Sequence, residues 1–266
     1  MSNEGLTGLR LAAADVSQAA ATLEPSALDT PSAAAGWTVR DVITHMGDLL
    51  DILMSAVRGE LDAEGVGIEE LNERRVSRKR GHNSEGAVEE FDRKVDSALE
   101  MFSGLQGEPY ASTEVPFLDL GTYPLHAMAD VCAFDFYTHL RWDILGPRGP
   151  LRTNVPEPDE ARLRPAVGWL LAGLPNMQPG IAAHVAKPLS LTLTGPGGGR
   201  WSLLPEDGAL VVSDRSADDA GAVADIRSST HLFTAWATTR LPWREHVELQ
   251  GDSTAASDFL DYLNLV

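Results

Sequence analysis

Asp135 and His139 are the residues best placed to do chemistry, because they lie four positions apart within the apolar segment 132–140. On a helix, residues at this spacing share one face and are about 40° apart around the axis. They can therefore offer one carboxylate oxygen and one imidazole nitrogen to the same point. In apolar surroundings such groups need a partner, since a lone buried charge is costly. The pair is either half of a metal site or a local salt bridge.

His45 is a third candidate, since it lies in the middle of a predicted helix among Ile43, Met46 and Leu49. Two histidines and one carboxylate around an open fourth position are typical of a catalytic zinc site. Facing helices of a bundle can share such a ligand set. The spacing alone does not bring His45 to the other two residues, and a single core histidine is commonly just hydrogen-bonded.

The elements that must hold these residues are helical. Up to about residue 180 the apolar residues recur with a helical period. Thr38 and Asp41 form a predicted capping box for a helix that ends near Gly59. Ser84 is the expected cap of a later helix. A long apolar helix is expected over about 124–145, and another over about 157–174.

After residue 180 the period changes to two, which predicts strands over 189–194, 200–204, 209–213, 223–226 and 246–249. Asp207-Gly208 is a hairpin signal, and helices are expected over about 229–236 and 253–265. We therefore predict an α+β protein with two domains, a helical bundle over residues 1–180 and a small α+β domain over residues 181–266.

Composition excludes several classes of function. The chain has 266 residues and a formal net charge of −18, which disfavours nucleic acid and anionic membrane surfaces as partners. We find no signal peptide and no membrane-spanning run, so we expect a cytoplasmic protein, monomeric or weakly dimeric. Cys132 is the single cysteine and has no adjacent base, which favours a buried inert thiol. His126 and Asp130 share a helix face roughly opposite to that of Asp135 and His139.

Two segments resemble a known family. Residues 36–45, Gly-Trp-Thr-Val-Arg-Asp-Val-Ile-Thr-His, resemble the first metal motif of the mycothiol-dependent maleylpyruvate isomerases, a branch of the DinB-like bundles. Asp135 and His139 resemble the second motif, an acid four residues before a histidine. The resemblance implies a DinB-like four-helix bundle that holds a divalent metal, most typically zinc, on His45, Asp135 and His139. It also implies a sterol-carrier-like domain in the C-terminal half.

The chain departs from this family at two positions near the second motif. The acid is often glutamate in the family, whereas Asp135 is one methylene shorter. In many members an aspartate stands third after the last histidine. Here Trp142 occupies that position and Asp143 is one residue later. These departures leave the prediction of the metal ligands better supported than the prediction of the reaction.

The resemblance further implies an enzyme that uses mycothiol as a thiol cosubstrate and a small electrophile as substrate. Addition and elimination of the thiol would isomerise a double bond from cis to trans, and addition alone would make the enzyme an S-transferase. An anionic substrate needs a cation, for which the resemblance suggests Arg240, with Arg244 as second candidate. Both could equally be surface arginines. The alternative function is a non-enzymatic carrier of a small molecule or lipid with a purely structural bundle.

Overall fold

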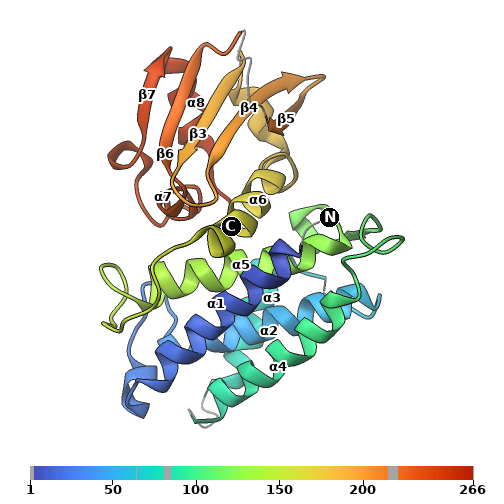
Figure 1. Cartoon of the computed structure of the whole chain (residues 1–266), viewed down its shortest axis with the longest axis vertical. Helices are drawn as coiled ribbons and strands as arrows, with labels where there is room; N and C mark the ends of the chain where they lie inside the picture. Colours follow the sequence, from blue (N-terminus) through green and yellow to red (C-terminus); the bar gives the residue numbers. More distant parts are fainter. Residues whose placement is uncertain (1–2, 64, 81–84, 215–220, 266) are drawn as a thin grey trace. The chain divides into compact units, whose positions relative to one another are not determined.

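The chain folds into two compact units, Met1–Glu157 and Pro158–Val266. The structure, a computed structural model, describes residues 3–63, 65–80, 85–214 and 221–265 (Figure 1). The first unit is mainly helical and the second contains a sheet, which confirms the predicted α+β class. The N-cap predicted at Ser84 lies outside the described residues. Among the described residues, no helix has the length and apolar character needed to cross a membrane.

Helix α2 is the central element of the helical unit, since it contacts α3, α4 and α5, while α1 packs against α4 and α5. The helices are α1 (Glu4–Ala21), α2 (Val39–Val57), α3 (Ile68–Lys79), α4 (Glu85–Ser103) and α5 (Met128–Thr138), with a two-stranded ribbon of β1 (Glu114–Pro116) and β2 (Thr122–Pro124). The apolar face of α2 is fully buried through Val42, Met46 and Leu50. Its start is the predicted capping box of Thr38 and Asp41.

The long helix predicted over 124–145 is not continuous. A 3-10 turn at Leu125–Ala127 precedes α5, and α5 passes into a π-helical turn, η4, over His139–Ile144. The amide of Leu145 donates to the carbonyl of Leu140 at 2.9 Å, a bond across five residues instead of four. A π turn takes in one residue more than an α turn, and its hydrogen-bond pattern leaves no mark in apolar periodicity.

Among its described residues, the second unit contains a sheet of five strands in the order β5-β4-β3-β6-β7. In this sheet β3 and β6 pair in parallel, and the other neighbours are antiparallel. The elements are α6 (Glu160–Met177), β3 (Leu189–Thr194), β4 (Gly199–Glu206), β5 (Ala209–Asp214), β6 (Ala224–Ser229), α7 (Thr230–Trp236), β7 (Glu248–Gly251) and α8 (Ser253–Tyr262). The predicted Asp207-Gly208 turn joins β4 to β5 with φ of 50° and 81°, as a type I′ hairpin requires.

The division between the units differs from the one predicted at residues 180 and 181. Helix α6 falls in the second unit, where it contacts β5, α7 and the 3-10 turn η5 (Pro179–His184). It buries Leu163, Val167 and Leu170. Helical periodicity shows that a helix has an apolar face, but it does not show which partner covers that face.

Candidate metal centre

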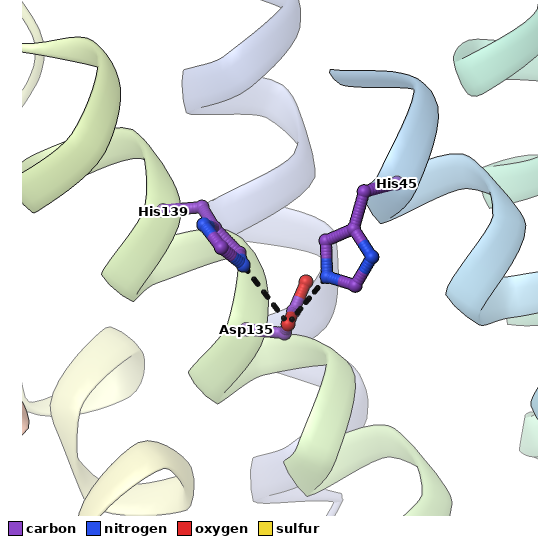
Figure 2. A group of neighbouring side chains, drawn as sticks. All are labelled: His45, Asp135 and His139. Atoms are coloured by element: carbon purple, nitrogen blue, oxygen red, sulfur yellow. Dashed lines mark hydrogen bonds and ion pairs between the residues drawn. The ribbon is translucent and has the colours of Figure 1, made fainter. Parts of the chain in front are cut away.

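His45 of helix α2, Asp135 of helix α5 and His139, the first residue of the π turn η4, come together in the helical unit, although the first two are 90 positions apart in the sequence. The Nε2 atom of His45 lies 3.3 Å from Oδ1 of Asp135, and Nε2 of His139 lies 3.5 Å from the same oxygen. Figure 2 shows the carboxylate of Asp135 reaching between the two imidazoles. The predicted pairing of Asp135 with His139 therefore occurs, and His45 joins it from the facing helix.

The three donor atoms have the types and spacing that a divalent metal requires. One ligand atom from each residue lies within 4.8 Å of the others. Zinc binds imidazole nitrogen and carboxylate oxygen at about 2.0–2.2 Å, so that ligands at two corners of a tetrahedron are about 3.3–3.6 Å apart. The separations of 3.3 and 3.5 Å fall at this spacing. These three residues fit three corners of a tetrahedral metal site.

Burial and charge also favour a cation at this point. The side chains of His45 and Asp135 are only 5% and 13% exposed. Burial lowers the pKa of His45, but the Asp135 carboxylate outweighs this effect and raises the pKa above its ordinary value. The Nδ1 atom of His45 is buried without a hydrogen-bond partner among the described residues. The cluster thus attracts positive charge, from a proton or from a metal.

His139 is oriented from its other side by Asp143. Its Nδ1 lies 2.8 Å from Oδ2 of Asp143, whose side chain is 2% exposed. Both residues lie in the π turn, and they are four positions apart, a spacing at which side chains of one helical face can meet. Metal-ligating histidines almost always use their second nitrogen in this way, which fixes the tautomer. Asp143, at the fourth position after His139, therefore supports this imidazole.

Trp37 packs against both imidazoles. Its ring centroid lies 5.0 Å from that of His45 and 6.5 Å from that of His139. The indole nitrogen donates to Oε2 of Glu73 at 2.7 Å, so that α3 holds the ring in place. Trp37 directly precedes Thr38, the first residue of the capping box of α2. The residues that start the helix therefore also fix the position of Trp37, which is next to them in the sequence.

The other residues considered in the sequence belong to the second unit or have structural contacts of their own. Arg240 and Arg244 belong to the second unit. The guanidinium of Arg244 pairs with Asp261 at 2.7 Å and covers the ring of Trp243. His126 lies 2.8 Å from the carbonyl of Ala111. Burial raises the pKa of the Cys132 thiol well above its usual range, with the carboxylate of Asp135 adding to the effect, which agrees with an inert thiol.

Sequence reasoning missed the side chains that surround the ligands. Trp37 belongs to the quoted motif, but its contact with the imidazoles was not predicted. Arg148, whose Nη1 donates to Oδ1 of Asp143 at 2.8 Å, had no local signal beyond its place in a Gly-Pro-Arg-Gly-Pro run.

A family model described as the mycothiol maleylpyruvate isomerase N-terminal domain matches residues 9–141. This range covers half of the chain and includes all three candidate ligands. Among solved structures, crystal structures of a mycothiol-dependent maleylpyruvate isomerase and of its histidine-to-alanine mutant are similar to the chain. Each has a TM-score of 0.58 at 18% identity, and the match covers 93% of this chain and 92% of the other. No curated protein matched the sequence.

Proposed function

Because the chain belongs to the mycothiol maleylpyruvate isomerase family, we propose that it is a metal- and thiol-dependent enzyme acting on small electrophiles. The observation that carries this proposal is the convergence of His45, Asp135 and His139 on one point. A carboxylate shared by two imidazoles would hold a divalent metal, and zinc fits the donor set best. A metal bound there would lower the pKa of a thiol placed at its open position, so that thiolate is present at neutral pH.

The chain's own residues would position the reacting groups. Asp143 fixes the ring of His139, and Trp37 packs against both imidazoles. Cys132, the single cysteine of the chain, is buried and its thiol pKa is raised, which makes it a poor nucleophile. The thiol must therefore be supplied as a cosubstrate, for which family membership suggests mycothiol.

The proposed reaction starts from an alkene conjugated to a carbonyl group. The thiolate sulfur forms a bond to the alkene carbon, and the π electrons move onto the carbonyl oxygen as an enolate. Rotation then occurs about the carbon–carbon bond that was the double bond of the alkene. The enolate then restores the double bond in the trans form and the carbon–sulfur bond breaks, which returns the thiolate unchanged. Protonation of the enolate before elimination would instead leave a thioether, which is S-transfer.

Arg240 is the proposed partner for an anionic substrate group. A charge-assisted hydrogen bond of this kind is worth about 1.5–3 kcal/mol. We expect Arg240→Met to raise the KM for an electrophile with a carboxylate by about 10-fold or more, and to leave the KM for its methyl ester unchanged. A larger effect of Arg244→Met on the carboxylate substrate would transfer this role to Arg244, and no effect of either would remove it.

Metal analysis and thiol consumption test the proposal directly. Protein purified without chelator should contain about one zinc per chain, and mycothiol should be consumed or an alkene isomerised when an electrophile is added. Chelation or His45→Ala should abolish this turnover, whereas His126→Ala, a histidine outside the cluster, should keep it. Unchanged turnover in metal-free protein would overturn the proposal. Protein without metal but with a co-purified apolar ligand would instead support a carrier.

A further inference from the structure

Arg148 stands at the end of a chain of contacts that begins at the candidate ligand His139. Asp143 binds His139 through Oδ2 and Arg148 through Oδ1, each at 2.8 Å. Because the Asp143 side chain is only 2% exposed, its charge requires a partner, and the guanidinium supplies one. The same Nη1 atom donates to the carbonyl of Trp142 at 2.8 Å, which holds the guanidinium against the π turn.

A second set of contacts joins this turn to the loop that carries Trp37. The amide of Ala33 donates to the carbonyl of Asp143 at 2.9 Å, and Nη2 of Arg148 lies 3.5 Å from the carbonyl of Ala33. Within the loop, Ser32 and Trp37 are joined by a backbone hydrogen bond of 2.9 Å. Arg148 therefore contacts both Asp143, which supports the ligand His139, and the loop that carries Trp37.

We propose that Arg148 is a positioning residue of the metal centre, which fixes the Asp143 carboxylate against His139 and holds the loop of residues 32–37 beside the same ligand. Its planar fork suits this position because two nitrogens can serve a carboxylate and separate carbonyls at once. It contacts none of the three proposed ligands and acts through Asp143. The inference rests on the metal centre of the proposed function.

The first test is zinc affinity, measured by competition with a chromophoric chelator at a temperature at which every variant is folded by circular dichroism. Loss of a group that supports a ligand typically costs 10–100-fold in metal affinity. We expect Arg148→Met to weaken zinc binding about 10-fold, and Asp143→Asn by at least as much. If Arg148 acts through Asp143, the double variant should bind within about twofold of Asp143→Asn alone.

Arg152→Met is the matched control, since Arg152 is an exposed arginine of the same segment. It should bind zinc as the wild type does. A general loss of stability would lower the melting temperature without producing this non-additive pattern. Wild-type affinity in Arg148→Met, or losses in the double variant that multiply, would overturn the role of Arg148.

Hydrogen exchange of metal-free protein gives a second readout that needs no zinc. Arg148→Met should speed amide exchange in residues 32–37 at least several-fold, with no change in α8, whereas Arg152→Met should leave both as in wild type. Unchanged exchange in this loop would overturn the link to Trp37. Wild-type protein that binds zinc but turns over no thiol would contradict the proposed function and leave this inference standing. Wild-type protein that binds no zinc would overturn both.

Discussion

Helix α2 takes part in two clusters with a buried carboxylate, and the difference between them separates a structural ion pair from a candidate metal site. Asp48 accepts from the ammonium groups of Lys79 and Lys94 at 2.6 and 2.7 Å. Asp135, by contrast, lies between two imidazoles, which carry charge only when protonated. The carboxylate of Asp48 has two lysine ammonium groups within hydrogen-bond distance, while that of Asp135 has two imidazole nitrogens beside it.

The Asp48 cluster, which also includes Asp51 and Glu90, has the properties of a structural network. Burial would raise the pKa of Glu90, but hydrogen bonds from Lys79 and Lys94 outweigh it and lower that pKa to about 2. Burial would lower the pKa of Lys94, but its carboxylate partners raise it. Glu90 and Lys94 are therefore both charged near neutral pH. Buried acidic residues therefore indicate a metal site only when the nearby bases are ligands instead of permanent cations.

The largest expected difference is in zinc affinity, between asparagine substitutions at Asp135 and at Asp48. Asp135→Asn replaces a charged ligand by a neutral amide and should weaken zinc binding more than about 100-fold, beyond the usual effect of supporting residues. Asp48→Asn should leave zinc affinity unchanged because Asp48 is not among the candidate ligands. Chelator competition measures both. Equal losses in the two variants would remove the distinction between the clusters.

Zinc should stabilise the protein through the Asp135 cluster alone. A ligand that binds only the folded state at about 100 times its Kd adds about 2.7 kcal/mol to the free energy of unfolding. We expect this gain in wild type and in Asp48→Asn, measured by urea denaturation with and without zinc. Asp135→Asn should gain less than about 0.5 kcal/mol under the same conditions, and a full gain in that variant would place the zinc elsewhere.

In metal-free protein, Asp48→Asn should lower the free energy of unfolding more than Asp135→Asn does. It removes one of the two carboxylates that Lys79 and Lys94 share, and we expect a loss of about 2 kcal/mol, below the 3–5 kcal/mol typical of fully buried pairs because the side chain of Lys79 is 34% exposed. Asp51→Asn is the control and should cost less than about 1 kcal/mol, since the Asp51 side chain is 39% exposed. Urea denaturation of chelator-treated protein measures both, and equal effects would contradict the ranking.

The smallest effect concerns acid stability. The folded-state pKa of Glu90 is about 2, below its ordinary value of 4.5, so its contribution is complete above pH 4.5 and is lost as pH falls toward 2. The free energy of unfolding of wild type should therefore approach that of Glu90→Gln over this range. We expect the difference between the two free energies of unfolding to be less than about 1 kcal/mol near neutral pH, because the Glu90 side chain is 40% exposed. A difference between the two proteins that is independent of pH would contradict the assignment.

Family membership and the local elements of the site were available from the sequence. The spacing of Asp135 and His139 predicted a shared helix face, and Thr38 and Asp41 predicted the start of α2. The alternation of apolar residues and the Asp207-Gly208 turn predicted the sheet. Each of these signals concerns residues within one or two turns of each other, where backbone geometry determines which side chains meet.

Only the tertiary structure brought His45 to Asp135 and Trp37 to both imidazoles, since these contacts depend on how helices pack. It also placed α6 with the sheet, because an apolar helix face does not specify its partner. The π turn after α5 depends on a shifted backbone hydrogen bond, which residue types do not encode, and it contains both His139 and Asp143. The sequence thus determined the candidate ligands, and the tertiary structure decided how they converge and what holds them.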